Sequence, residues 1–412
     1  MPRLAATAVA AVLACVAAFA QPFTLFDFGD QAAMESREGI RVIREPAQYQ
    51  FIEDGASGAA VEVSLPGQVM VLADPALLDG AAPRDGGNGV SFMLRGDGSD
   101  NWGCVTFAGF GSDMRYAYSL YVPLTDTTWH EVRAHFSEMV AEPPIYPIGE
   151  PGMLPPSGVG SLILGTRWTI WWNNAPMPEH SYAIDEVRLI ADAPEPAPAP
   201  APRSLSEVLQ LLREREPVTI QCMGDSVTAG TGLADRENER YAARLQAILR
   251  EHLGYDGITC YSRAVGGAKV NDARFWWRRD FAGVQPDLVT LAYGYNDKSN
   301  TVSADYYRYA LNDYIDRIAR VTGGGAAICP ITTLPGASHR FVMLDDYARQ
   351  VRELCAQRGD VTCIDLAGEI HPMGREAWGE LLGDLAHPNA AGHEWIANAI
   401  ADWLMERVEG MG

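Results

Sequence analysis

The sequence predicts two domains, an all-β sandwich followed by an α/β domain. Up to residue 192, short apolar segments alternate with turn residues and show no helical pattern, which is typical of a β-sandwich. A proline-rich segment follows, and from residue 203 on apolar strands alternate with amphipathic helices, which favours a mostly parallel sheet. A chain of 412 residues is long enough for two or three domains with cores of their own.

The composition indicates an ordinary globular protein with an acidic surface. Hydrophobic residues make up 47% of the chain, and the formal net charge is −21. Nucleic acid is a polyanion that attracts basic surfaces, so we expect no nucleic-acid partner for an acidic chain of this kind. The charge fits a soluble, secreted protein.

Residues 1–20 have the pattern of a secretory signal peptide. Arg3 precedes an apolar run that ends in Ala18-Phe19-Ala20, a small-residue cleavage pattern. Anchoring as a lipoprotein at Cys15 is an alternative, but the apolar run continues beyond that cysteine. We expect a secreted or periplasmic protein with no transmembrane segment after cleavage.

In the first domain, residues 21–192, alternating apolar and polar positions mark the strands. These strands are expected over 40–44, 60–65, 89–95, 114–122, 129–136, 161–170 and 182–190. Asp27, Asp30 and Asp185 lie on or beside the first and last strands, where carboxylates could hold a structural calcium. Six aromatic residues are either core or sugar-stacking positions: Trp102, Tyr116, Tyr118, Trp168, Trp171 and Trp172.

Residues 193–202 alternate proline and alanine, with one glutamate, and separate the first domain from residues 203–412. Repeated proline neither pairs in a sheet nor continues a helix, so this segment should be an extended, semi-rigid linker.

The second domain shows five apolar strands with helices between them. The strands are expected over 218–223, 258–261, 287–292, 326–331 and 361–365, and helices over 241–253, 306–321, 345–358 and 390–408. Strands of this kind form a parallel sheet that is covered on both faces.

Four short motifs fall after these strands, where ligands of open parallel sheets bind. They are Gly-Asp-Ser at 224–226, Gly-Gly at 266–267, Gly-Tyr-Asn-Asp at 294–297 and Asp-Leu-Ala-His at 384–387. Ser226 is a weak nucleophile that needs a base, His387 can take its proton, and Asp384 can orient the imidazole. The backbone N–H groups of Ser226 and Gly267 and the side chain of Asn296 could then bind the oxyanion.

Both domains resemble known families. With these four motifs in this order over residues 217–408, the second domain resembles the SGNH hydrolases, also called GDSL esterases. This resemblance implies a flavodoxin-like α/β/α sandwich and ester hydrolysis without a cofactor for catalysis. Residues 89–98, 129–132 and 184–189 resemble the galactose-binding-like jelly rolls, a group that contains many carbohydrate-binding modules.

Further candidates for substrate binding are Trp276 and Trp277, near Gly267, and Tyr295 in the third motif. The two tryptophans are either sugar-stacking residues or core of the helix that follows. No metal-binding motif such as H-E-x-x-H is present in the sequence.

Together these features predict a secreted serine esterase that removes small acyl groups, mainly acetyl, from a polysaccharide or oligosaccharide. Two alternatives stay open. One is a lipase or thioesterase with the same triad, and the other is a glycan-binding protein with an inactive hydrolase-like domain.

Overall fold

The computed structural model describes residues 22–36, 38–74, 87–109, 117–142 and 158–411, so the expected signal peptide lies outside the described residues. Contacts divide the chain into two compact units. The described residues of unit 1 lie before residue 143 and in 158–169 and 177–196, whereas unit 2 contains Ile170–Pro176 and 197–411. The sequence had assigned Ile170–Pro176 to the first domain, and its contacts place it in the second.

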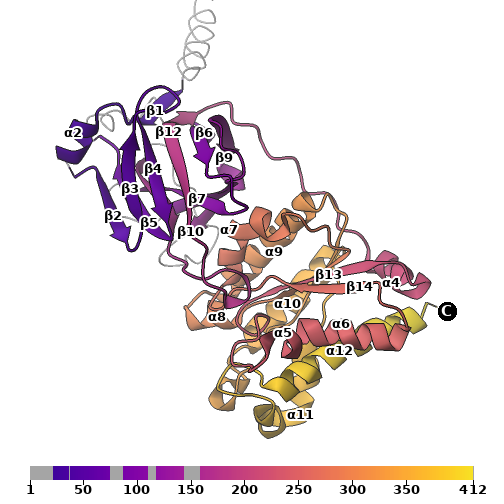
Figure 1. Ribbon diagram of the computed structural model, residues 1–412. Helices are drawn as coiled ribbons and strands as arrows, with labels where there is room; N and C mark the ends of the chain where they lie inside the picture. Colours follow the sequence, from indigo (N-terminus) through magenta and orange to yellow (C-terminus); the bar gives the residue numbers. More distant parts are fainter. Residues whose placement is uncertain (1–21, 37, 75–86, 110–116, 143–157, 412) are drawn as a thin grey trace, which may run out of the picture. The chain divides into compact units, whose positions relative to one another are not determined.

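Unit 1 consists of two antiparallel sheets (Figure 1). In the first, the strand order is β3-β4-β12-β6-β9 with β1 beside β12, and in the second it is β10-β8-β7-β11-β5-β2. The strands are β1 (Phe23–Phe26), β2 (Ile40–Arg44), β3 (Gln48–Ile52), β4 (Ala60–Leu65), β5 (Gly67–Leu72), β6 (Gly89–Gly96), β7 (Trp102–Gly109), β8 (Ala117–Pro123), β9 (His130–His135), β10 (Val140–Glu142), β11 (Val159–Thr166) and β12 (His180–Ile190). One short helix, α2 (Gln31–Ser36), follows β1.

The two sheets share one hydrophobic core, because alternate residues of each strand point inward. Phe92 on β6 and Phe107 on β7 meet across it, with ring centroids 6.4 Å apart. Among the six aromatic candidates, Tyr118 is buried in this core, Tyr116 lies outside the described residues, and Trp171 and Trp172 belong to unit 2.

The expected calcium site is not supported. The strands β1 and β12 pair as expected, but no cluster of three metal-binding side chains occurs among the residues that the structure describes. The buried carboxylate of Asp185 instead accepts hydrogen bonds from the backbone N–H groups of Ser57, at 3.1 Å, and Glu186, at 2.7 Å. Asp185 therefore fixes a turn, while Asp27 and Asp30 are exposed.

Unit 2 contains a parallel sheet with the strand order β14-β13-β15-β16. The strands are β13 (Val218–Gly224), β14 (Ile258–Ser262), β15 (Leu288–Ala292) and β16 (Ala327–Pro330). The expected fifth strand at 361–365 is reduced to a single bridge between Ile331 and Ile364. It is short because Asp365 already caps the next helix by accepting a hydrogen bond from Gly368.

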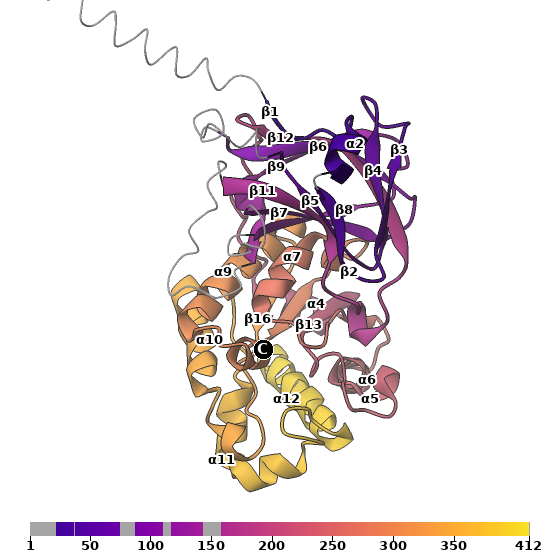
Figure 2. The same ribbon diagram turned by 90° about the vertical axis from the view of Figure 1, so that its left-hand side faces the viewer.

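Helices cover both faces of this sheet. On one side, α4 (Leu205–Glu214), α6 (Tyr241–Leu253) and α12 (Ala390–Glu409) share a core with β13, whereas α7 (Val270–Phe281) and α9 (Ala304–Val321) lie on the other (Figure 1). Figure 2 shows α10 (Asp345–Arg358) beside α9. The remaining helices are α5 (Arg236–Glu239), α8 (Tyr295–Ser299) and α11 (Leu366–Glu380). In the described part of the chain, no helix is long and apolar enough to cross a membrane.

Candidate active site

Ser226, His387 and Asp384 form a continuous chain of hydrogen bonds at the carboxyl edge of the parallel sheet. The His387 Nε2 atom lies 2.9 Å from Ser226 Oγ, and Nδ1 lies 2.8 Å from Asp384 Oδ2. Because an ionised carboxylate only accepts hydrogen bonds, Nδ1 carries the proton and Nε2 is left to accept from the serine hydroxyl. Ser226 and His387, 161 positions apart in the sequence, thus meet with Asp384 in the arrangement that a nucleophile, a base and an orienting acid require.

The Asp384 carboxylate is held by its own turn. Its Oδ1 atom accepts hydrogen bonds from the backbone N–H groups of Ala386, at 2.7 Å, and His387, at 2.8 Å. Partial burial raises the pKa of Asp384, but these bonds and the bond from the imidazole lower it more, to about 2. The carboxylate therefore stays ionised at any pH at which His387 acts as a base.

Gly267 lies in the loop between β14 and α7, with a left-handed φ of 81° that favours glycine. A Cβ atom at this position would contact nothing within 4 Å, so the loop is open on that side. Among the described residues, neither Gly267 nor Ser226 uses its backbone N–H in a hydrogen bond to the protein. Both groups are therefore available to a ligand.

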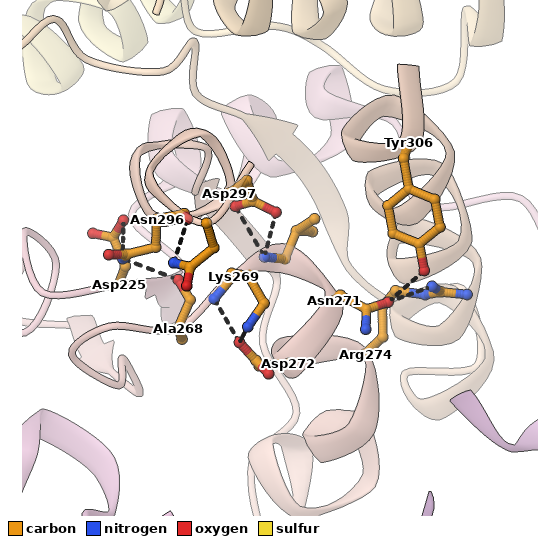
Figure 3. A network of polar contacts seen from close by, with 11 residues as sticks. Asp225, Ala268, Lys269, Asn271, Asp272, Arg274, Asn296, Asp297 and Tyr306 are labelled. Carbon is orange, nitrogen blue, oxygen red and sulfur yellow. Dashed lines mark hydrogen bonds and ion pairs between the residues drawn. The ribbon is translucent and has the colours of Figure 1, made fainter. Parts of the chain in front are cut away.

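Asn296, at the start of α8, is placed differently from the other two predicted oxyanion donors. Its Nδ2 group donates to Asp225 Oδ2 and to the carbonyl oxygen of Ala268, both at 3.1 Å (Figure 3). Both amide hydrogens are thus engaged, and the side chain links the serine turn to the Gly267 loop. It can reach an oxyanion only if one of these bonds opens.

A layer of buried polar side chains packs against the loop that carries Gly267 (Figure 3). Asp297 accepts from the backbone N–H of Val270 at 3.3 Å, and Lys269 pairs with Asp272 at 2.8 Å. Burial raises the pKa of Asp225 to about 6 and that of Asp297 to about 7. Sequence reasoning missed Lys269 and Asp272, although charges directly after a motif glycine were a usable signal.

The structure places the three candidates for substrate binding in different environments. Tyr295 lines a small pocket with Asp225, Val227 and Ala386, directly beside the triad. Trp276 is only 2% exposed and packs against the Arg279 guanidinium, 4.6 Å from its ring centroid, so the structure favours a core position over sugar stacking. Trp277 is half-buried, with the Arg278 guanidinium 4.9 Å from its ring centroid, and its substrate contact stays a prediction.

Comparison with known proteins agrees with this geometry. Residues 222–395 match the family model described as "GDSL-like Lipase/Acylhydrolase family". An acetylxylan esterase of Geobacillus stearothermophilus is 22% identical over 209 residues, which are 45% of this chain and 95% of the relative.

Solved structures similar to this chain include two hydrolases. An acetyl xylan esterase is 20% identical, with a TM-score of 0.38, and the match covers 44% of this chain and 98% of that one. A lipase/acylhydrolase from Enterococcus faecalis is also 20% identical, with a TM-score of 0.39, over 46% and 96% of the two chains. With the family match and the triad, unit 2 carries a GDSL-like hydrolase domain, and the protein is a carboxylic ester hydrolase.

Proposed function

We propose that this protein is a secreted esterase that removes acetyl groups from a polysaccharide or oligosaccharide. The observation that carries the proposal is the hydrogen-bonded chain of Ser226, His387 and Asp384, with two pockets of very different size lined by these residues or their neighbours. The acetylxylan esterase among its relatives supports the same substrate class.

In the first half-reaction, Ser226 Oγ attacks the ester carbonyl carbon while His387 Nε2 takes the hydroxyl proton. The backbone N–H groups of Ser226 and Gly267 stabilise the negative oxygen of the tetrahedral intermediate, and Asn296 joins them when one of its present bonds opens. As the intermediate collapses, the imidazolium gives its proton to the departing sugar hydroxyl. The acetyl group is left on the serine.

In the second half-reaction, water takes the place of the sugar. His387 removes a proton from the water as it attacks the acyl carbon, and the same donors hold the second oxyanion. Ser226 then leaves with the proton from the imidazolium, and acetate is released. Throughout, the ionised Asp384 keeps the imidazole in the required tautomer and stabilises its charged form.

The two pockets support a small acyl group and a large alcohol. The pocket lined by Asp225, Val227, Tyr295 and Ala386 has a volume of about 20 Å³, room for roughly one water-sized group. A second cleft, lined by His387 and other residues from 231–239 and 383–390, measures about 280 Å³. The first volume suits the methyl group of an acetyl ester better than a long acyl chain, and the second is large enough for a sugar.

The first domain has a place in the proposed function as a glycan-binding module. Its two antiparallel sheets are compatible with a galactose-binding-like jelly roll. In that case it would hold the enzyme on its glycan, as carbohydrate-binding modules do, and secretion would bring the enzyme to that glycan.

Acetate release from a panel of acetylated plant and algal glycans tests the substrate. We expect acetate from at least one glycan and a steep fall in rate from p-nitrophenyl acetate to the octanoate. Faster turnover of octanoate would instead favour a lipase or thioesterase.

The Ser226→Ala variant tests whether the chain is an enzyme at all, because it removes the nucleophile without disturbing the fold. Glycan binding by a parent that hydrolyses no ester would point to the binding-protein alternative.

A further inference from the structure

The segment Ile170–Pro176, here called the WN hairpin, lies in the chain between β11 and β12 but belongs to unit 2. Its ends pair through the bridge between Ile170 and Pro176, and the backbone N–H of Trp171 donates to the carbonyl of Ala175 at 2.7 Å. Asn173 and Asn174 form its tip, both with left-handed φ angles, of 56° and 61°. Asparagine tolerates this conformation better than most residues do.

The tip of the WN hairpin reaches the loop that carries Gly267. Asn174 Oδ1 accepts a hydrogen bond of 2.7 Å from the backbone N–H of Gly266. Its Nδ2 donates to Thr231 Oγ1 at 2.8 Å, and the backbone N–H of Thr231 donates to the carbonyl of Ser226 at 2.9 Å. One side chain thus connects the nucleophile turn with the glycine loop.

The space above Gly266 is filled by this side chain. A Cβ atom at position 266 would lie 2.6 Å from Asn174 Oδ1, whereas one at position 267 would meet nothing within 4 Å. Glycine is therefore required at positions 266 and 267 for different reasons. Gly266 leaves room for Asn174, and Gly267 allows the positive φ that presents its N–H to the ligand side.

The hairpin is also anchored at its base. The indole N–H of Trp172 donates to Asp280 Oδ1 at 2.8 Å, and Asp280 forms a buried ion pair with Arg279 at 2.7 Å. The Arg279 guanidinium lies 4.4 Å from the ring centroid of Trp171. Since Arg279 and Asp280 end the same helix, α7, that begins just after the glycine loop, the hairpin is fixed to both ends of this helix.

We propose that Asn174 is a positioning residue for the oxyanion donor Gly267. Because its bond holds the N–H of Gly266, it limits rotation of the 265–266 peptide, and so it orients the next N–H, that of Gly267, toward the carbonyl oxygen of an ester bound at Ser226. This inference rests on the proposed role of Gly267. It implies that residues 203–412 alone lack part of the active site.

The test compares Asn174→Gly with Asn173→Gly in the full chain. Both substitutions suit a left-handed φ, and each removes two side-chain hydrogen bonds. Those of Asn173 go to Ser262, the last residue of β14, and not to Gly266. With the best p-nitrophenyl ester of the parent, we expect kcat of Asn174→Gly to fall by about 10- to 100-fold, less than the roughly 10²–10³-fold loss of a donor itself. KM should change little, and Asn173→Gly should stay within about threefold of the parent.

A second measurement separates positioning from general damage. A boronic acid that forms a tetrahedral adduct with Ser226 should bind Asn174→Gly more weakly by the same factor as kcat/KM falls, since it mimics the transition state. Loss of activity through partial unfolding would instead lower the titrated active fraction and leave the affinity of the remaining sites unchanged, which would overturn the inference. Equal kcat in parent and Asn174→Gly would overturn it as well, without touching the proposed esterase. A parent that hydrolyses no ester would overturn both.

Discussion

Asp297 offers a quantitative test of the buried layer below the catalytic loop, through the variant Asp297→Asn. The Asp297 side chain is fully buried. Within the described part of the chain, its carboxyl group accepts hydrogen bonds only from the backbone N–H of Val270. Burial raises its pKa from 3.8 to about 7, with the nearby Asp272 adding to the rise and Lys269 opposing it. The folded protein therefore holds a proton that the unfolded chain releases.

The sign of the pH effect follows from this difference. Below pH 3.8 the carboxyl is protonated in both states and has no effect, and above pH 7 it is ionised in both, with the full cost of burying the charge. Between these values the free energy of unfolding falls by about 1.4 kcal/mol for each pH unit. From pH 5 to pH 8 the parent should lose roughly 3 kcal/mol through this group.

The variant Asp297→Asn resembles the protonated acid and cannot ionise, so it should lack this loss. Urea unfolding of parent and variant at pH 5 and pH 8, followed by the loss of esterase activity, gives the two free-energy differences. We expect the advantage of the variant to grow by roughly 3 kcal/mol between the two pH values. An advantage that does not change with pH would show that Asp297 is already ionised at pH 5, and the reasoning from burial would fail.

Three further predictions concern the catalytic residues. His387→Ala should lose about 10⁴-fold or more in kcat/KM with an unchanged melting temperature, and a loss below tenfold would exclude it as the base. Asp384→Asn should be milder, with a fall in kcat smaller than the roughly 10⁴-fold of a buried triad aspartate, because the carboxylate is largely exposed. The stability of the parent should decline as the pH falls from 3.8 to about 2, because a carboxylate with a depressed pKa stabilises the fold only while it is ionised. The Asp384→Asn variant should not show this decline. Gly267→Ala should cost about 1–2 kcal/mol in stability through its positive φ and lower kcat more than KM, as steady-state kinetics beside thermal unfolding would show.

The sequence predicted most of unit 2 because its signals are local and repeated. The helices at Tyr241–Leu253 and Asp345–Arg358 match the expected boundaries, since their apolar spacing is regular and both end at a glycine with positive φ. Ser226 and His387 could be brought together from the sequence because a parallel sheet places all its loops of one kind at one edge. That argument needs only the order of the strands.

What the sequence did not predict depends on contacts between distant segments. Asn174 lies in a turn whose residues are common in surface loops, and nothing in its local pattern indicates Gly266 as its partner. Trp276 was ambiguous because stacking on a sugar and packing in a core require the same residue type, and only its burial decides between them. The engagement of Asn296 with Asp225 is likewise a property of the assembled site.

The contrast between Asp225 and Asp384 explains how one site can keep two carboxylates in different roles. Hydrogen bonds keep Asp384 ionised, with a pKa of about 2, and one of them comes directly from the imidazole. Asp225 is buried, with a pKa raised to about 6, and its hydrogen bonds go to the backbone N–H of Val227 and to Asn296 instead. At pH 8 both carboxylates are ionised, so their roles differ through their hydrogen-bond partners and not through their charge. The hydrogen bonds therefore assign the orienting role to Asp384 and leave Asp225 to hold the side chain of Asn296.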